Sequence, residues 1–472
     1  MKTAVIRSGD VFANRDERFD ASYHLSEAIA VKRLIHKSPY PLTTIGEVSK
    51  DIFYGNRAKR VYVCDKKYGI PFLSSSDILK ADVENVKLAS KKYTSGIEQL
   101  RLKEGWILVS RSGTIGNTAW TNKQHAQKLA SEHVIRIIPN DILRGGYVYA
   151  YLSTKYGYSL LTQGTFGGVI QHIEPDHVAS IPIPCIPDTI QKKIESLIKD
   201  SALLRERSAE LKAESIKYFE DKSSLGPIRA SEYESYGPRS QNKQVSCFSK
   251  NIAEVGHVTI NAFNHSNRIT LLKNRLSQTT RTISLKDCLT EKGLFSTGAF
   301  PRVELESDRG VELINQRDIF DSIIKGKMIS KRGVSLDKLV EKDEIIIAGV
   351  GTLGESETFC RCVYGNDYLK GKLISGEFIR MKTNSSIPAG YLFMWLSSDY
   401  GFRLIRSTQA GTKLCRPIPQ LLENIPVPIL DRNDMSIIDA YVKESQECFA
   451  KASFKEQEAI NMIEAEIEKW NN

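Results

Sequence analysis

The sequence predicts an α+β fold in which two similar units, related by a pseudo-two-fold axis, are joined by two long antiparallel coiled-coil helices. Two observations predict it. Short motifs of the first half recur in the second half in the same order, and each half ends in a long stretch without proline or glycine. The length of 472 residues also exceeds what one ordinary core requires.

The repeat is visible in short runs whose offset drifts by only a few residues. Gly-Thr-Ile-Gly at 113–116 matches Gly-Thr-Leu-Gly at 351–354, an offset of 238, and Thr-Ile at 44–45 matches Thr-Ile at 282–283. Three further runs, at 131–137, 151–157 and 181–184, recur 244 residues later. Since chance matches would not keep both order and offset, the chain contains two copies of one unit.

Each copy shows the same order of expected elements. An amphipathic helix over 25–36 or 268–276 is followed by short strands and turns, such as 106–109 and 345–347, and then by a helix over 147–161 or 391–405. Ile-Pro-Ile-Pro and Ile-Pro-Val-Pro come next and cannot be helical. We expect domains over 1–187 and 259–431, long helices over 188–222 and 432–472, and a polar linker over 223–258.

The two long helices carry a coiled-coil pattern with small residues. Ile190, Leu197, Leu204, Leu211 and Tyr218 recur every seven residues. Small residues lie midway between them and at matching positions of the second helix: Ser201, Ser208, Ser215, Ser445, Ala452 and Ala459. Small side chains allow close approach, which favours packing of the helices on each other. The alternative is that each helix caps its own domain, although a length of roughly 50 Å exceeds that need.

The composition limits the class of protein and its partners. Hydrophobic content is 41% and charged content 26%, which is typical of globular proteins. The net charge of +10 favours nucleic acid as a partner, with simple solubility as the alternative. Eight scattered cysteines suit a cytoplasmic protein without a metal site, including the Cys-x-Cys of Cys360 and Cys362. No run is long and apolar enough to suggest a membrane span or signal peptide.

The doubled motifs resemble the specificity subunits of Type I restriction-modification systems. The run 105–116 resembles that family's strand and Gly-Thr-x-Gly turn, and 163–184 and 409–428 resemble its Gly-Thr segment leading to Ile-Pro-x-Pro. One departure is that the second long helix lacks the glutamine found at Gln191 in the first. The system could therefore be an ordinary Type I enzyme or a divergent methylation-linked phage-defence complex.

The resemblance implies a non-catalytic subunit that recognises double-stranded DNA. Each domain would read half of a split target, and the helix pair would fix the gap between the halves. Partner methyltransferase subunits would bind S-adenosylmethionine and methylate adenine, a nuclease and translocase subunit would also be recruited, and this chain would hold no cofactor. Two alternatives remain: an enzyme with an unfamiliar site, and a repeat-built adaptor that binds only protein.

One motif taken alone suggests nucleotide binding. Residues 349–354 contain Gly-x-Gly-x-x-Gly after a strand-like run. The following residues, 355–363, read as strand or loop where a dinucleotide site requires a helix, and the first copy lacks the first glycine. A tight turn is the favoured interpretation. His172 and His177 have no counterparts in the second copy and are expected to be structural or DNA-facing.

The candidate DNA contacts lie where the two copies differ inside a shared frame. Ser74-Ser75-Ser76 and Asn315-Gln316-Arg317 both precede Asp-Ile, and Asn, Gln and Arg suit bidentate contacts with base edges. Basic residues that could bind phosphates lie around these loops, with the last three as weaker candidates: Arg57, Lys59, Arg60, Arg302, Lys331, Arg332, Arg111, Lys413 and Arg416. The alternatives are solvated charges, and an Arg317 that only braces Asp318.

Overall fold

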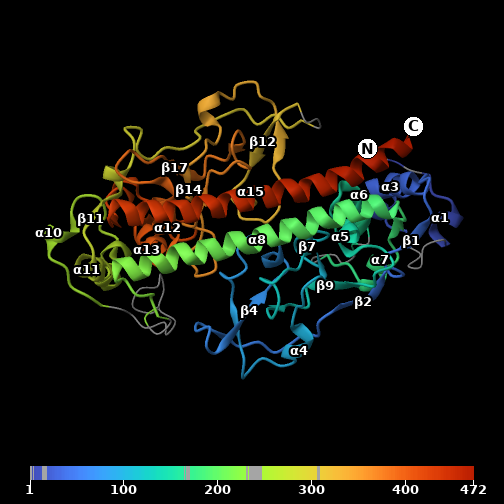
Figure 1. Ribbon diagram of the computed structural model, residues 1–472, viewed down its shortest axis with the longest axis horizontal. Coiled ribbons are helices and arrows are strands. Elements are labelled where there is room, and N and C mark those ends of the chain that lie inside the picture. Colours follow the sequence, from blue (N-terminus) through green and yellow to red (C-terminus); the bar gives the residue numbers. More distant parts are fainter. Residues whose placement is uncertain are drawn as a thin grey trace. The chain divides into compact units, whose positions relative to one another are not determined.

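The computed structural model describes residues 3, 5–12, 19–163, 165, 171–229, 232, 247–305 and 309–471. The centre of the expected linker, 233–246, and Gly164 of the first Gly-Thr segment lie outside these residues. The chain divides into two compact units. Unit 1 comprises residues 1–206 and 452–472, and unit 2 comprises residues 207–451. Each unit is described by itself, and Figure 1 labels their elements.

Unit 1 contains two four-stranded sheets and a group of helices. One sheet has the order β2-β9-β6-β7, the other is β3-β5-β4-β8 with β4 and β8 parallel, and β1 pairs with β10. The elements are α1 (Ser8–Phe12), α2 (Ala21–His24), α3 (Glu27–Ile35), β1 (Leu42–Thr44), β2 (Ser49–Tyr54), β3 (Tyr62–Val63), β4 (Gly69–Leu73), η1 (Asp77–Leu79), β5 (Leu88–Ser90), α4 (Ile97–Leu100), β6 (Ile107–Ser110), β7 (Thr118–Trp120), β8 (Leu129–Ala130), β9 (Val134–Pro139), α5 (Gly145–Ser153), α6 (Lys155–Gln163), α7 (Pro175–Ala179), β10 (Pro182–Pro184) and the first part of α8 (Asp188–Ser223).

Unit 2 repeats this plan with smaller sheets. Its three-stranded sheets are β15-β14-β17 and β13-β12-β16, and its strand pairs are β11-β20 and β18-β19. The elements are α10 (Ile252–Val255), η3 (Ala262–His265), α11 (Asn267–Thr279), β11 (Thr282–Ser284), η4 (Leu285–Cys288), β12 (Val311–Ile314), β13 (Lys327–Ile329), η5 (Leu336–Lys338), β14 (Ile345–Ala348), β15 (Cys362–Tyr364), β16 (Leu373–Ile374), β17 (Phe378–Met381), α12 (Ala389–Ser397), α13 (Asp399–Ser407), β18 (Gln409–Ala410), β19 (Arg416–Pro417), α14 (Pro419–Leu422), β20 (Pro426–Pro428) and α15 (Arg432–Glu468), which continues into unit 1 and ends at η6 (Lys469–Asn471).

The helix expected over 147–161 is instead a pair of helices, and so is the one over 391–405. In unit 1, Thr154 is extended between α5 and α6, and its hydroxyl accepts a hydrogen bond from Gly157 N at 2.9 Å. Ser398 breaks α12 from α13 in the same way. A Cβ on Gly157 would lie 2.3 Å from Tyr151 O, so the Tyr-Gly of the repeat permits the close turn. Hydrophobic periodicity alone did not reveal this break.

The proline-rich segments are not helical, as expected, and form strands. In unit 1, β10 pairs antiparallel with β1. The Tyr147 hydroxyl donates to Pro184 O and the Tyr151 hydroxyl donates to Pro182 O, both at 2.7 Å. In unit 2, β20 pairs with β11 and receives equivalent bonds from Tyr391 and Trp395. The repeated motif therefore supplies carbonyl acceptors to buried aromatic side chains.

The strand partners correct one alignment of the repeat. Ile45 N donates to Ile181 O at 2.9 Å, and Leu285 N donates to Ile425 O at 3.0 Å. Ile45 therefore corresponds to Leu285, an offset of 240, and the match to Ile283 at 238 is wrong by two residues. A shift of two residues in the alignment keeps each side chain on the same face of a strand, so the incorrect match still looked plausible.

The two long helices begin at the expected positions and bury the expected small residues. Ser201, Ser208, Ser215, Ser445, Ala452 and Ala459 are all buried. In unit 1, Ser201 Oγ donates to Ala452 O at 2.9 Å. In unit 2, Ser445 Oγ donates to Ser208 O at 2.8 Å, and Tyr218 of α8 donates to Asp434 of α15 at 2.7 Å, so these segments of α8 and α15 run antiparallel. Within each unit the two helices thus contact one another directly.

Candidate nucleic-acid interface

In unit 1 the loop after β4 is held by Asp77. Ser74 donates to the Asp77 carboxylate from its backbone N at 2.9 Å and from its hydroxyl at 2.6 Å. Ser74 and Ser75 are half-buried, whereas Ser76 is exposed. The Asp-Ile frame shared with the second copy is therefore a structural anchor, because Asp77 fixes the loop and Ile78 is buried in the core.

The Gly-Thr-Ile-Gly turn after β6 packs on this loop. Thr114 Oγ1 donates to Ser75 O at 3.1 Å and lies 2.8 Å from Ser110 Oγ. Gly113 and Gly116 both have positive φ, at 79° and 80°, a region that favours glycine. The sequence-predicted loop and the repeated turn therefore form one surface at the ends of β4 and β6.

Two histidines complete this surface. His133 precedes β9, and its Nδ1 lies 2.7 Å from Ser112 Oγ of the turn. The His172 ring stacks on it, with centroids 6.2 Å apart and planes 12° from parallel. Burial lowers the pKa of His133, with Arg111 and His172 acting in the same direction, and the nearby Glu132 partly offsets this. The two rings can present hydrogen-bond donors and acceptors at the surface.

Two of the predicted phosphate contacts in unit 1 are engaged within the protein. Arg60 makes a 2.8 Å ion pair with Glu132. Arg111 pairs with Glu174 and lies 4.3 Å above the Tyr54 ring. Arg57 and Lys59 are exposed near the same loop. A phosphate would meet Arg57 and Lys59 without first breaking an ion pair of the kind that holds Arg60 and Arg111.

In unit 2 the corresponding loop after β12 separates its three variable residues into two roles. Asn315 Nδ2 donates to Asp318 Oδ2 at 3.3 Å. Gln316 makes two bonds with the backbone of Val350, donating to its O at 2.5 Å and accepting from its N at 3.2 Å. Arg317 is exposed. Asn315 and Gln316 therefore shape the loop, and Arg317 occupies the same outward position as Ser76.

The glycine-rich turn of unit 2 also meets the β18–β19 hairpin. Gly351 and Cys415 exchange backbone hydrogen bonds at 2.7 and 3.1 Å, and the hairpin exposes Lys413 and Arg416. A Cβ on Gly351 would lie 2.8 Å from Phe359 Cβ, so close packing accounts for that glycine. No helix begins in the described residues 355–361, so the helix that a dinucleotide site requires is not formed there.

The remaining basic candidates of unit 2 are exposed. Arg302 lies 5.4 Å from the Phe300 ring, and Lys331 and Arg332 follow β13. Lys331 and Arg332 follow the edge strand β13, beside the start of β12, whereas Arg317 follows the other end of the central strand β12. Arg302, Lys331 and Arg332 are therefore exposed, whereas Arg60 and Arg111 are paired with carboxylates.

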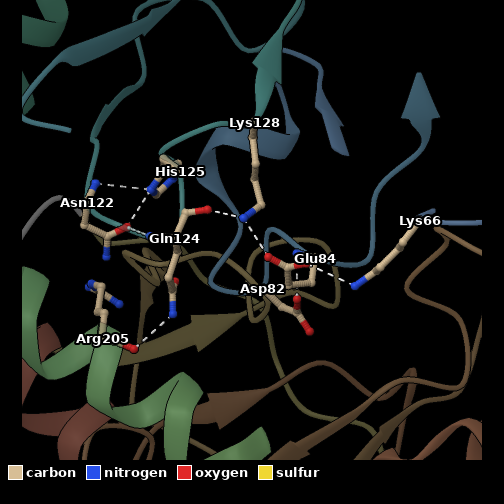
Figure 2. A network of polar contacts seen from close by, with 8 residues as sticks. All are labelled: Lys66, Asp82, Glu84, Asn122, Gln124, His125, Lys128 and Arg205. Atoms are coloured by element: carbon tan, nitrogen blue, oxygen red, sulfur yellow. Dashed lines mark hydrogen bonds and ion pairs between the residues drawn. The ribbon is translucent and has the colours of Figure 1, made fainter. Parts of the chain in front are cut away.

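A polar loop connects unit 1, on the side of its candidate surface, to the long helix. We call the surface formed by the Ser74–Ser76 loop, the Gly-Thr-Ile-Gly turn and the two histidines the candidate reading surface. Figure 2 shows Asn122, Gln124 and His125 beside Arg205 of α8, with Lys128 reaching Glu84. Lys123 N donates to Glu206 at 2.9 Å, and Gln124 Nε2 donates to Arg205 O at 3.2 Å. Burial lowers the pKa of His125 to about 4, so this imidazole is neutral near pH 7. The loop thereby fixes the sheet on its helix.

Unit 2 contains the counterpart of this anchor. Asn366, which follows Asn122 by 244 residues, donates to Gln446 of α15 at 3.1 Å and accepts from the backbone of Tyr368 and Leu369. Sequence inspection missed both asparagines, although their equal offset was a usable signal. It also missed His133, whose counterpart Glu377 differs within the matched run at 131–137.

Other site classes find no support within the part of the chain that the structure describes. No group of three or more His, Cys, Asp or Glu side chains there could hold a metal ion. Cys360 and Cys362 are free thiols, and burial raises the pKa of both. None of the helices in the described ranges is long and apolar enough to cross a membrane.

Comparison with known families finds a match over the first copy. Residues 43–213 match the Type I restriction modification DNA specificity domain. The resemblance predicted from the motifs is thus confirmed over this part of the chain. The matched residues include the Ser74–Ser76 loop, the Gly-Thr-Ile-Gly turn and the first part of α8.

Solved structures with related descriptions cover most of the chain. A Type I restriction-modification S subunit from M. genitalium is 12% identical, covers 92% of this chain and 96% of its own, and has a TM-score of 0.33. The HsdS subunit from Thermoanaerobacter tengcongensis is 14% identical, with coverages of 92% and 97% and a TM-score of 0.25. A chain from a structure of the type I R-M system is 12% identical, covers 92% of this chain and 98% of its own, and has a TM-score of 0.27. No curated protein matches the sequence.

Proposed function

We propose that this chain directs a methylation-based restriction or defence complex to a split DNA target, with each copy reading one half. The match of residues 43–213 to a DNA specificity domain carries the proposal. The second copy supports it, because it repeats the loop, glycine-rich turn and helix anchor with different outward residues. Residues 1–187 and 259–431 are the two target-recognition domains in this proposal, and 223–258 is the linker.

The long helices would set the spacing between the two half-sites. Their small residues are buried, and in unit 2 the Ser208 and Ser445 hydroxyls lie 3.1 Å apart. Such close packing favours a stiff antiparallel pair and a pseudo-two-fold relation between the domains. A stiff connection would hold two reading surfaces at a fixed distance, which a split target requires.

The chain would act without catalysing a reaction. The partners in this proposal are methyltransferase subunits, which would supply S-adenosylmethionine and transfer the methyl group, and a nuclease and translocase subunit. The complex would act on DNA in the cytoplasm. The outward side chains of both copies suit recognition: serine and histidine in the first, arginine in the second, and exposed cations around both.

Sequencing of DNA methylation in a host that carries the complete operon tests the proposal. The expected result is one methylated motif made of two defined halves separated by a fixed gap, lost when this chain is deleted. Methylation that is unchanged by the deletion would contradict the proposal and favour the protein-binding adaptor. A purified chain that methylates DNA without any partner would contradict the non-catalytic assignment.

A further inference from the structure

Unit 1 has a second surface on which lysine and tyrosine alternate. Three tyrosines are unusually exposed: Tyr62 at 46%, Tyr68 at 58% and Tyr93 at 59%. A lysine ammonium lies over each ring, from Lys87 at 5.5 Å, Lys67 at 5.5 Å and Lys92 at 5.3 Å. Isolated exposed tyrosines need no explanation, but three lysine–tyrosine pairs on one small sheet form a defined feature.

The feature lies on and just beyond the strands of the β3-β5-β4-β8 sheet. Tyr62 pairs with Ala89, and Ala89 pairs with Ile70. Tyr62 therefore shares a face with Ala89, which is buried, and with Ile70. Arg60, Tyr68, Lys87 and Lys91 lie just beyond the strand ends, where Lys91 N donates to Tyr68 O at 2.9 Å. Lys67, Lys92 and Tyr93 adjoin these residues. We call this set the lysine–tyrosine face.

The lysine–tyrosine face is continuous with the candidate reading surface. The Arg60 guanidinium lies 5.1 Å from the Phe72 ring and pairs with Glu132, the neighbour of His133. Phe72 also meets Tyr62, with ring centroids 6.2 Å apart. The face therefore extends outward from the loop and turn that carry Ser76 and Gly113.

The charge of this region distinguishes the first copy from the second. Residues 57–93 contain nine Lys and Arg against four Asp and Glu, an excess of five. The corresponding residues 298–334 contain seven against six, an excess of one. One of the four acids, Glu84, is already engaged by Lys66 and Lys128 at 3.1 and 2.6 Å. Arg60 and Lys66 are paired with carboxylates, so the other basic residues of this stretch carry the charge that an anionic partner would meet in unit 1.

We infer that the lysine–tyrosine face binds the phosphates of duplex DNA that flanks the half-site read by the first copy. The inference rests on the proposed function. Lysine ammoniums contact phosphates, and the tyrosine rings hold the lysine side chains in place and offer hydroxyl donors. Such contacts add affinity without adding sequence information. The two copies would then contribute unequally to the salt-dependent part of binding.

The test uses the full chain and a fluorescent duplex of random sequence, so that no target sequence is needed. Anisotropy titrations over a range of KCl concentrations would compare the wild type with K67Q/K87Q/K92Q. Each lost phosphate contact reduces the slope of log K against log [KCl] by about 0.9, so the expected reduction is roughly 2 to 3. The control is K37Q/K103Q/K193Q, which removes the same charge from exposed lysines of unit 1 outside the face.

The outcomes separate this inference from the proposed function. Equal slopes for the two triple variants would overturn the inference, since net charge alone would then account for the change. A larger loss on a single-stranded probe than on the duplex would also overturn it and indicate a single-strand site. If the wild type binds neither probe, the proposed function fails before the inference is reached. Thermal unfolding of each variant confirms that it is folded.

Discussion

The two copies bury an arginine at the same position and satisfy it differently. Arg136 of β9 donates to the backbone carbonyls of Leu100, Ala130, Ser131 and Val134. Arg380 of β17, 244 residues later, is fully buried too but forms a bidentate pair with Glu344, at 2.8 to 3.0 Å, besides two carbonyls. Burial lowers the pKa of Arg136 to about 10. At this one position the buried cation is thus held by uncharged carbonyls in one copy and by a carboxylate in the other.

The outward positions differ in another way. Asp77 and Asp318 hold their loops in both copies, whereas the exposed residue before each is Ser76 in one and Arg317 in the other. The comparison teaches that the buried frame tolerates only substitutions that satisfy the same hydrogen-bonding need. The exposed positions carry no such constraint and are free to differ in what they recognise.

Removing one partner of the Arg380–Glu344 ion pair should have the largest effect. Arg380→Met leaves the Glu344 carboxylate buried without its cation, and we expect a loss of about 3–5 kcal/mol in unit 2. Replacing both residues with methionine should recover most of that loss, because an apolar pair has no buried charge to compensate. Hydrogen exchange of β14 and β17 would report the local stability.

Arg136, which donates to backbone carbonyls, provides the contrast. Arg136→Met leaves several buried carbonyls without donors, and there is no single acidic partner whose removal could compensate. No one further substitution is expected to rescue it. If the double methionine variant in unit 2 is no more stable than Arg380→Met alone, the Glu344 charge is not the source of the loss.

The two copies should also differ in their response to acid. His125 is buried with a pKa of about 4, and the corresponding residue of unit 2 is Leu369. Below pH 6.5 the unfolded chain binds a proton that the folded chain excludes, so unit 1 loses up to roughly 3 kcal/mol as pH falls from 6.5 toward 4. Hydrogen exchange at pH 7 and pH 5 should show unit 1 weakening more than unit 2. His125→Leu should remove most of that difference, because His133 also has a lowered pKa and accounts for the rest. A difference that is not reduced would assign it to other groups.

Overpacking the helix contacts tests the small residues. Ser208→Leu and Ala452→Leu should each cost about 1–3 kcal/mol, because both side chains are buried where the helices touch. Chemical denaturation gives the change in each unit. Leu203→Ala is the control, since Leu203 is 58% exposed on α8 and should cost much less. Equal costs at Leu203 and Ser208 would argue against close packing at Ser208.

The smallest expected effect is on a single phosphate contact. Lys331→Ala should weaken binding evenly across DNA sequences and lower the salt slope by about 0.9. Lys370→Ala serves as the control for the loss of one exposed charge in unit 2. Anisotropy with two unrelated duplexes would measure both. A loss confined to one duplex would instead give Lys331 a part in reading sequence.

Much of the architecture could be predicted because it depends on patterns with long range in the sequence. The repeat, the long helices that begin at Asp188 and Arg432, and their buried serines and alanines all follow from periodicity and spacing. The break at Thr154 could not be predicted in the same way. It depends on a hydroxyl that caps the next helix and on a glycine that lies against a carbonyl.

The candidate interface was predictable in position but not in detail. The sequence indicated the loops at 74–76 and 315–317 because they differ within a shared frame. Which side chains face outward depends on contacts from distant segments: Val350 engages Gln316, and Glu174 engages Arg111. His133 and His172 meet only after folding, so neither their spacing nor their residue type revealed the pair.

Methylation profiles of two matched variants test most directly whether each copy reads its own half-site. Hosts carrying the complete operon with wild type, Ser76→Ala or Arg317→Ala would be compared by sequencing of methylated motifs. We expect Arg317→Ala to cost roughly 1–3 kcal/mol at one base position and to relax only one half of the motif. Ser76→Ala should affect only the other half. Uniform loss of methylation in both variants, or relaxation of the same half by both, would contradict the account.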